Sequence, residues 1–461
     1  MKKSSSSAAR GLNIIIVGCG KVGVTLVDQL SKEGHDITII DKSSQKIQAL
    51  TNVYDVMGVV GNGASYSILM EAGIENADLL ISVTESDELN LLCCTMAKRV
   101  GKCEAIARVR TPDYSDEINY LREKLGLVMI INPELAAANE AVRILCLPTA
   151  LEVNTFAHGQ AELIKFKLPE GNVLSDKTIA SIGKTYAKDI LICAVERMGQ
   201  ISIPSGNFEL KSGDYISFVA SRDGSRAFLK NIGFTIKQVK NTMIIGGGKA
   251  AFYLAKQLLK LGIHVKIIEN DRERCEALSI LLPEAIIING DGTDADLLKE
   301  EGLETAESFV PLTGIDEENI MLTLHARQVS KAKVITKVNR INFHEVLSNL
   351  DLGSVIYPKY ITSEAIIAYV RARRASIGSN IETLYHIDPR VEAIEFKVAQ
   401  GSPVTNISLM ELNLKDNLLI AFINRNGKII IPSGNDTIMA NDTVMIVTTH
   451  TGFNDIKDIL K

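Results

Sequence analysis

A glycine-rich turn near the amino terminus carries residues whose types and spacing suit phosphate binding. Glycines occupy its first, third and sixth positions, at Gly18, Gly20 and Gly23. An apolar run at 13–17 precedes the turn, helical periodicity follows it, and Asp41 ends the next apolar run. Gly18 permits a tight turn, Gly20 lets backbone N–H groups approach a pyrophosphate, and Gly23 lets the helix pack closely. The pattern predicts a dinucleotide-binding loop, with phosphates at the positive end of a helix.

The acid at the tip of the second predicted strand narrows the class of ligand. Asp41 is placed to accept hydrogen bonds from the hydroxyls of a ribose. An acid there disfavours a 2′-phosphate, so NAD(H) or an adenine nucleotide is expected in preference to NADP. The motif identifies a pyrophosphate and a ribose, and it does not separate NADH from ATP or ADP.

The same pattern occurs a second time, 228 positions later. Gly246 and Gly248 correspond to Gly18 and Gly20, and Glu269 corresponds to the first acid. Ala251 replaces the third glycine. Further matching stretches are 61–64 with 290–293, 87–90 with 316–319 and 203–207 with 431–435. The chain is therefore predicted to be a tandem duplication of a two-part unit.

Length and composition set the broad class. A chain of 461 residues, 46% of them hydrophobic, is expected to form three or four domains with buried cores. A net charge of −5 argues against a nucleic-acid-binding face. The seven cysteines show no zinc spacing, which predicts reduced thiols in a cytoplasmic protein without a metal site. No apolar run approaches the ~18 residues of a membrane span, so a soluble protein is expected.

Periodicity predicts an α/β architecture in each repeat. Residues 12–140 and 240–370 alternate short apolar strands with helical segments, which predicts a doubly wound parallel sheet. Residues 150–232 and 380–461 are each expected to form a small α+β domain. In the first of these, strands are predicted at 163–168, 191–195 and 215–219, with a hairpin at 197–204. Connectors are predicted at 145–156, 238–241 and 377–384.

These features together resemble the TrkA family, the cytoplasmic regulatory subunits of bacterial Trk potassium uptake, which carry two tandem RCK (KTN) units. The resemblance extends over almost the whole chain. It is carried by the order of the parts and by the stretches 61–63, 83–90, 107–114 and 290–293. It implies Rossmann-like RCK N-terminal domains, each followed by a small RCK C-terminal domain.

The resemblance also implies the residues that contact a nucleotide. In the first repeat they are Gly18, Cys19, Gly20, Lys21, Val22, Gly23, Asp41, Asn62, Thr84, Glu85 and Arg108. In the second repeat they are Gly246, Gly247, Gly248, Lys249, Ala250, Glu269, Asp291, Thr313 and Lys337. Because the second set departs from the pattern, either binding with altered preference or a purely structural repeat is consistent with it.

Partners and location are likewise implied by the resemblance. A ring of subunits, expected to be a tetramer of tandem units, would lie on the inner face of the plasma membrane under a TrkH-type potassium-translocating protein. The segments 116–125 and 343–350 are candidate assembly surfaces. A basic cluster at 371–374 fits either a helix carboxyl terminus or an anionic membrane partner.

No catalytic constellation emerges from the sequence. The seven histidines show no pairing with serine, cysteine or acidic residues, so no catalytic residue is assigned. Two alternatives to the regulatory subunit remain at this point: an NAD-dependent oxidoreductase, and a soluble nucleotide sensor without a membrane partner.

Overall fold

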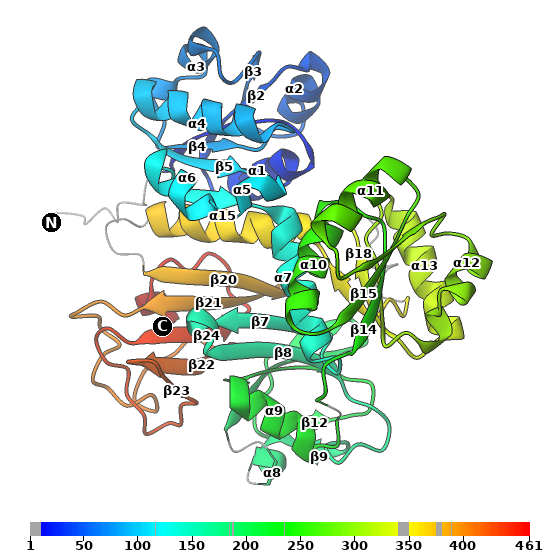
Figure 1. Ribbon diagram of the computed structural model, residues 1–461. Coiled ribbons are helices and arrows are strands. Elements are labelled where there is room, and N and C mark those ends of the chain that lie inside the picture. Colours follow the sequence, from blue (N-terminus) through cyan, green and yellow to red (C-terminus); the bar gives the residue numbers. More distant parts are fainter. Residues whose placement is uncertain are drawn as a thin grey trace, which may run out of the picture. The chain divides into compact units, whose positions relative to one another are not determined.

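The computed structural model describes residues 11–461 except 116, 184, 187–188, 235, 340–349, 375–379 and 389. Most of the candidate assembly segment at 343–350, and residue 116 of the other, lie outside the described residues. The chain separates into two compact units (Figure 1). The first is Met1–Ala136 with Pro358–Ser379, and the second is Ala137–Tyr357 with Asn380–Lys461.

The first unit contains a six-stranded sheet whose paired strands are all parallel, in the order β3-β2-β1-β4-β5-β6. Its strands are β1 (Asn13–Val17), β2 (Asp36–Asp41), β3 (Met57–Val60), β4 (Leu79–Ser82), β5 (Glu104–Arg108) and β6 (Met129–Ile131). Its helices are α1 (Lys21–Lys32), α2 (Ser44–Thr51), α3 (Tyr66–Glu71), α4 (Asp87–Val100), α5 (Pro112–Ser115), α6 (Ile118–Lys124) and α15 (Pro358–Arg374). The strand order reverses between β1 and β4, as in doubly wound sheets, and this confirms the predicted fold class.

Helix α15 belongs to this unit although it comes from the second half of the sequence. It packs against α1 (Figure 1). Arg371 is 7% exposed and its Nη2 lies 2.6 Å from Glu33 Oε1. Arg373 Nε lies 2.9 Å from Glu104 Oε2. These ion pairs account for two arginines of the basic cluster, for which the sequence left open a helix carboxyl terminus or contact with an anionic membrane partner.

The second unit contains the equivalent sheet, in the order β16-β15-β14-β17-β18-β19. Its strands are β14 (Asn241–Ile245), β15 (His264–Glu269), β16 (Ile286–Asn289), β17 (Ser308–Pro311), β18 (Lys333–Lys337) and β19 (Ser354–Ile356). The helices are α10 (Lys249–Lys260), α11 (Arg272–Leu281), α12 (Ala295–Glu300) and α13 (Asp316–Val329). The same strand order in both sheets confirms the duplication.

Helix α7 (Pro133–Cys146) is hydrogen-bonded to this second sheet's domain. Asn139 Oδ1 accepts from Gln257 Nε2 of α10 at 2.8 Å.

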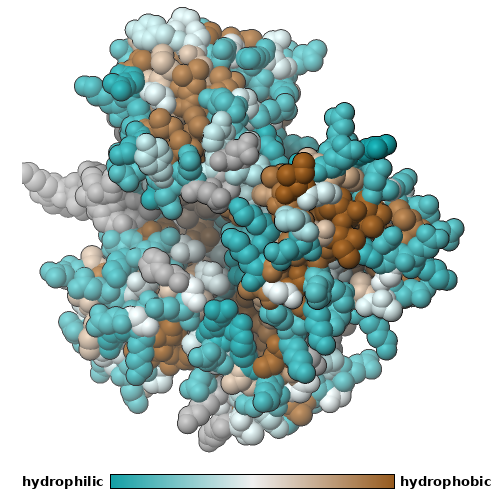
Figure 2. Space-filling model, viewed as in Figure 1, coloured by the Kyte–Doolittle hydropathy of each residue, from teal (hydrophilic) through white to brown (hydrophobic). Residues whose placement is uncertain are grey.

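Figure 2 shows apolar residues gathered on the visible face of the domain that contains α10 and α11. Exposed apolar side chains at the ends of α10 and α11 include Leu261, Ile280 and Leu281. Among the described residues, no helix is both long enough and apolar enough to cross a membrane.

Two five-stranded sheets of the small domains complete the second unit, in the orders β11-β10-β13-β8-β7 and β20-β21-β24-β22-β23. The first has β7 (Glu152–Phe156), β8 (Ala161–Lys167), β10 (Ile190–Arg197), β11 (Gln200–Ser202) and β13 (Tyr215–Ser221). The second has β20 (Ile381–Asp388), β21 (Val391–Lys397), β22 (Leu418–Arg425), β23 (Lys428–Ile430) and β24 (Thr443–Thr448). Shorter elements are β9 (Lys177–Thr178), β12 (Glu209–Leu210), α8 (Ile179–Gly183), α9 (Arg222–Asn231), η1 (Ile74–Asn76), η2 (Ala157–Gly159), η3 (Leu303–Thr305) and η4 (Ile456–Ile459).

The two small domains share a hydrophobic cluster, in addition to a separate cluster within the first domain. Phe156, Leu163 and Val219 of the first domain lie in the same buried cluster as Phe422 and Val447 of the second. Two of the predicted connectors, 145–156 and 377–384, are wrong in part because they overlap strands. Residues 152–156 and 381–388 are strands that pair with β8 and β21 and contribute to the shared cluster.

The predicted hairpin at 197–204 is confirmed. Strands β10 and β11 pair antiparallel, with Arg197 opposite Gln200. The two residues between them, Met198 and Gly199, have φ of 50° and 73°. Positive φ at both central residues is typical of the tight turns that suit the twist of a β-hairpin.

We expect the Arg371 ion pair to hold α15 in the first unit. Replacing Arg371 with Met should lower the free energy of opening this helix by about 2 kcal/mol, because Glu33 loses the counter-charge of the buried guanidinium. Hydrogen exchange of the α15 amides measures the change. Lys32→Met is the matched control, since Lys32 and Asp28 form an exposed pair on α1 worth less than about 0.5 kcal/mol. Unchanged exchange in the Arg371 variant would contradict the assignment.

Candidate nucleotide-binding sites

Two glycines of the first turn are required by the chain's own packing. Gly18 has a φ of 103°, and a Cβ at this position would lie 2.9 Å from the backbone nitrogen of Thr84. A Cβ on Gly23 would lie 2.0 Å from the carbonyl oxygen of Gly18. Any larger residue would therefore push α1 away from the turn or the turn away from β4.

Gly20 has a different reason to be glycine. A Cβ there would meet no atom of the described residues within 4 Å, so the space beside it is open. Gly20 is also the N-cap of α1, and no side chain caps this helix or places an acid in its first turn. By contrast, Ser43 and Ser86 cap α2 and α4. The first N–H groups of α1 are thus left for an anion, which the helix dipole favours.

Asp41 lies at the end of β2 and is held against this turn. Its Oδ2 accepts from the backbone N–H of Cys19 at 2.7 Å, and its Oδ1 accepts from that of Ser43 at 2.8 Å. A carboxylate has further lone pairs, so it can also accept from ribose hydroxyls. Burial, followed by the charge of Asp41, raises the pKa of the Cys19 thiol to about 12. Cys19 therefore remains a protonated thiol at neutral pH and is no nucleophile.

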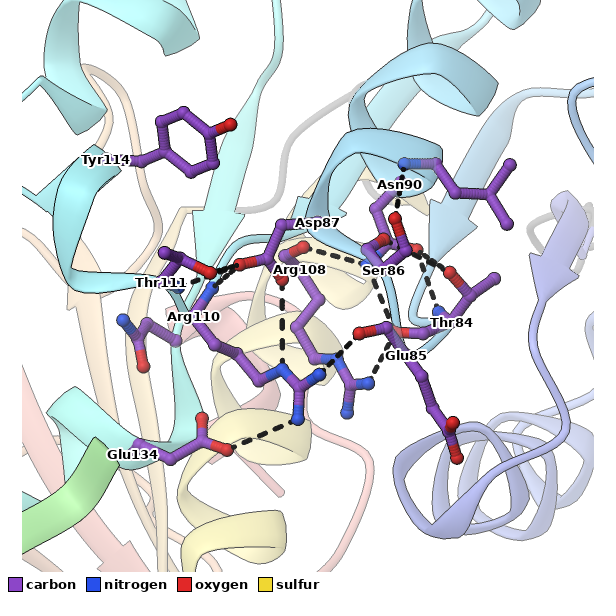
Figure 3. A network of polar contacts seen from close by, with 12 residues as sticks. Thr84, Glu85, Ser86, Asp87, Asn90, Arg108, Arg110, Thr111, Tyr114 and Glu134 are labelled. Atoms are coloured by element: carbon purple, nitrogen blue, oxygen red, sulfur yellow. Dashed lines mark hydrogen bonds and ion pairs between the residues drawn. The ribbon is translucent and has the colours of Figure 1, made fainter. Parts of the chain in front are cut away.

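A buried amide joins the carboxyl ends of β4 and β5 (Figure 3). Asn90 Oδ1 accepts from the backbone N–H of Thr84 at 2.8 Å, from Thr84 Oγ1 at 2.7 Å and from Ser82 Oγ at 3.0 Å. Its Nδ2 donates to the carbonyl oxygens of Thr84 at 3.2 Å and Arg108 at 2.9 Å. The amide therefore sets the direction of both chain segments as they leave the sheet.

Two arginines lie over the same edge (Figure 3). Arg108 donates from Nη2 to the carbonyl oxygen of Thr84, and Arg110 donates from Nη2 to that of Glu85 at 2.6 Å. Asp87 accepts from the backbone N–H of Arg110 at 2.9 Å. Burial, and then the charge of Arg110, lowers the pKa of Arg108. Arg108 Nε is buried and makes no hydrogen bond to any described residue. An anion at this edge would offset the repulsion between the two cations.

The second site repeats this geometry with a smaller turn residue and a longer acid. Gly248 again faces open space and begins α10 without a side-chain cap. Glu269 accepts from the backbone N–H groups of Gly247 at 2.5 Å and Asp271 at 2.8 Å. A Cβ on Gly247 would lie 3.1 Å from Glu269 Cγ and 2.6 Å from Leu278 Cδ1. The longer acid is therefore matched by a glycine, where the first site pairs Cys19 with the shorter Asp41.

The cations of the second site also hold backbone carbonyls. Arg274 Nε donates to the carbonyl oxygen of Gly247 at 2.6 Å, and Lys337 Nζ donates to that of Leu312 at 3.0 Å. Asn319 repeats the buried amide, accepting from the backbone N–H of Thr313 at 2.9 Å and donating to the carbonyl oxygen of Lys337 at 3.1 Å.

The remaining predicted residues lie at the same two sheet edges. Asn62 and Asp291 stand after β3 and β16, and each accepts a hydrogen bond from the backbone N–H two residues later. This bond is the main cause of the lowered pKa of Asp291. Lys21 and Glu85 are exposed. The structure places the other predicted residues, Val22, Lys249 and Ala250, in the first turns of α1 and α10.

Sequence reasoning assigned no role to five residues that build these sites. They are Asp87, Asn90, Arg110, Arg274 and Asn319. The repeat of 87–90 at 316–319 contained the signal for Asn90, because a polar residue recurring at the start of a predicted helix needs a reason. The role as a buried acceptor and donor becomes visible only when two strands end beside that helix.

Comparison with known families gives matches over most of the chain. The TrkA-N domain model matches residues 14–133 and 242–358, and the TrkA-C domain model matches residues 163–233 and 393–461. A Trk system potassium uptake protein TrkA homolog from Archaeoglobus fulgidus is 31% identical over 450 residues, covering 98% of this chain and 100% of the relative. The Trk system potassium uptake protein TrkA of Haemophilus influenzae is 31% identical over 440 residues, covering 94% and 93%.

Solved structures show the same fold at low sequence identity. The GsuK channel bound to NAD superposes with a TM-score of 0.63 at 16% identity, covering 97% of this chain and 78% of that chain. The GsuK RCK domain also gives a TM-score of 0.63 at 16% identity, covering 97% and 93%. These likenesses confirm the tandem Rossmann-like and RCK architecture.

We predict that Asn90 is essential to the order of the first site. Asn90→Ala should lower the free energy of unfolding by about 2–3 kcal/mol, because several buried polar groups lose their partner at once. Chemical denaturation measures the change. Leu92→Ala on the same helix is the control, since Leu92 is 51% exposed and its truncation should cost less than about 0.5 kcal/mol. Equal effects of the two substitutions would show that the amide has no special role.

Proposed function

The chain belongs to the TrkA family, and we propose that it is the nucleotide-sensing regulatory subunit of a Trk-type potassium uptake system. Two relatives that match nearly its full length are named Trk system potassium uptake protein TrkA or a homolog of it. In this proposal the subunit controls a TrkH-type membrane potassium-translocating protein. It does so from the cytoplasmic face of the membrane, as a ring of tandem units.

One observation carries the nucleotide-sensing part of the proposal. In each repeat, a helix of 12 residues begins without a side-chain cap, behind a glycine whose missing Cβ leaves open space. An acid from the next strand is hydrogen-bonded to the same turn. A pyrophosphate fits the uncapped N–H groups and a ribose fits the acid.

The expected ligands are NAD(H), ATP or ADP. Asp41 and Glu269 favour a ribose without a 2′-phosphate. The GsuK channel, which shares the fold, has been solved with NAD bound. When bound, such a nucleotide would supply negative charge and no reaction. Arg108, with its lowered pKa and its buried Nε, is placed to meet that charge.

Regulation follows from differential binding to two conformations. A nucleotide shifts a conformational equilibrium only if it binds one state more tightly than the other. The buried amides of Asn90 and Asn319 link the turns after β4 and β17 to the ends of β5 and β18. Movement of a turn around a ligand is therefore transmitted to a second strand of each sheet.

The two repeats should respond differently. Site one pairs Cys19 with Asp41, whereas site two pairs Gly247 with the longer Glu269. Arg274 adds a cation to the second turn. We propose that the sites differ in affinity or in their preference between dinucleotide and mononucleotide.

Substitutions at Gly20 and Gly23 of the first turn distinguish an effect on ligand binding from an effect on folding. Gly20→Ala should weaken nucleotide binding at the first site by about ten-fold or more, since the added methyl occupies the pyrophosphate's space at a cost of at least ~1.4 kcal/mol. The melting temperature of this variant should fall only slightly, because alanine is a poorer N-cap than glycine but its Cβ meets no described atom. Gly23→Ala should instead lower stability by about 1–3 kcal/mol, because its Cβ meets the carbonyl of Gly18. Calorimetric titration with NADH, NAD, ATP and ADP, beside thermal unfolding, measures both effects.

Gly248→Ala and the acid variants Asp41→Ala and Glu269→Ala extend the test to each site separately. If both sites bind a nucleotide, each substitution should lower the number of nucleotides bound per chain at its own site only. Absence of binding by all four nucleotides at millimolar concentration would refute the proposal. Turnover of NADH with a substrate would instead favour an oxidoreductase, and co-expression without association with a TrkH-type protein would favour a soluble sensor.

A further inference from the structure

A cavity of about 1350 Å³ lies in the second unit, away from that unit's candidate nucleotide site. It borders the residues that precede strands β14, β17, β18 and β19, whereas the nucleotide site lies at the opposite, carboxyl edge of the same sheet. Pro148 and Leu151, just before and at the start of the first small domain, also line it. Its cationic lining residues are Lys167, Lys237, Lys240, Arg327, Lys331 and Lys333.

The duplication provides an internal control for this cavity. Glu104 begins β5, and the equivalent first residue of β18 is Lys333. In the first unit, Glu104 is neutralised by Arg373 near the end of α15. Counted from the proline that begins each helix, the position of Arg373 corresponds to Pro148, which lies beyond the end of α7. The strand residue is therefore negative in the first unit (Glu104) and positive in the second (Lys333). The helix position that supplies the counter-charge in the first unit, Arg373, is an uncharged proline, Pro148, in the second.

Lys333 sits in surroundings that disfavour its own charge. Its side chain is half-buried, and Nζ donates a hydrogen bond to the carbonyl oxygen of Ala150. Burial, and then the charge of Arg327 on α13, lowers the pKa of the amine to about 7. Both effects would be opposed by a negative charge placed in the cavity.

The acids that line the cavity are fewer than the cations and are already engaged. Glu307 accepts a hydrogen bond from the backbone N–H of Lys240 at 2.7 Å. Asp351 is paired with Arg327, and Glu304 lies 3.9 Å from Lys299. The cavity therefore has an excess of positive charge.

The carboxyl end of a helix attracts cations, and this accounts for part of the cluster. Arg327 lies in the last turn of α13 and Lys331 follows that helix closely. The helix dipole gives no such account of Lys333, which is a strand residue and is directed to the carbonyl of Ala150 in the small domain. A half-buried amine in these surroundings either loses its proton or keeps its charge beside a bound anion.

We propose that this cavity binds a small organic anion carrying two or more phosphate groups, with Lys333 as its central counter-ion. The volume exceeds what one phosphate requires, and the six cations are spread over several segments. The site is distinct from the candidate nucleotide sites and does not depend on them.

Proton linkage gives the proposed site a signature. Anion binding stabilises the charged amine, raises the pKa of Lys333 and takes up a proton near neutral pH. Affinity should therefore rise as the pH falls from 8.5 to 6.5, through the pKa of about 7. The other titratable groups facing the cavity are the acids and lysines named above.

Inorganic tripolyphosphate is the probe. It is titrated calorimetrically at low ionic strength into the full chain carrying Gly20→Ala and Gly248→Ala, so that binding at both candidate nucleotide sites is weakened. Lys333→Met in this background should weaken binding by about ten-fold or more, because it keeps the apolar stem and removes the charge. Lys428→Met, at an exposed lysine of β23 outside the cavity, should change binding less than about two-fold.

Three results would overturn the proposal: no binding of tripolyphosphate at 25 °C to a folded chain, equal loss in the Lys333 and Lys428 variants, or binding without proton uptake at pH 7. The pH dependence is read as the ratio between the parent and Lys333→Met, which cancels the probe's own ionisation. Lys333→Gln checks the fold through its melting temperature. Because every variant carries the same substitutions at Gly20 and Gly248, the difference between the Lys333 and Lys428 variants does not depend on whether the nucleotide sites bind.

Discussion

The buried amide of Asn90, repeated at Asn319, is the interaction on which the site end of each sheet depends. Parallel strands leave their backbone groups unpaired where they end, and buried groups of this kind must find partners. One amide satisfies the ends of two neighbouring strands in each repeat. Because these bonds are internal, the turns are ordered before any ligand arrives. Arg108 can then lie over that edge and remain available to an anion.

The two repeats keep this amide and differ in what surrounds it. The pair of Cys19 with Asp41 becomes Gly247 with Glu269, so the acid reaches the turn in both cases through compensating sizes. Outside the sites the divergence is larger, since Glu104 and Lys333 carry opposite charges at one sheet position. Duplication followed by such changes gives a single chain two related but unequal candidate sites.

Packing between distant parts of the sequence defines the two compact units. Helix α15 follows the second Rossmann-like sheet in sequence yet is held by Glu33 and Glu104 of the first unit. The two small domains likewise bury one core between their sheets. The two repeats are therefore joined by packing as well as by the chain. A conformational change in one repeat can act on the other through these contacts.

The sequence by itself determined the repeat, the doubly wound class of the parallel sheets and the two glycine-rich turns. Glycine spacing and the period-two and period-3.6 patterns are properties of short stretches of sequence. It also indicated which residues stand at the carboxyl ends of parallel strands. Strands 152–156 and 381–388 escaped prediction since their burial comes from a partner sheet distant in sequence. Only the tertiary structure decided the roles of Asn90, Arg110 and Arg274, the pairing of Arg371 with Glu33, and the position of Lys333 in a cavity. Each depends on which segments meet in space, and a one-dimensional pattern does not encode that meeting.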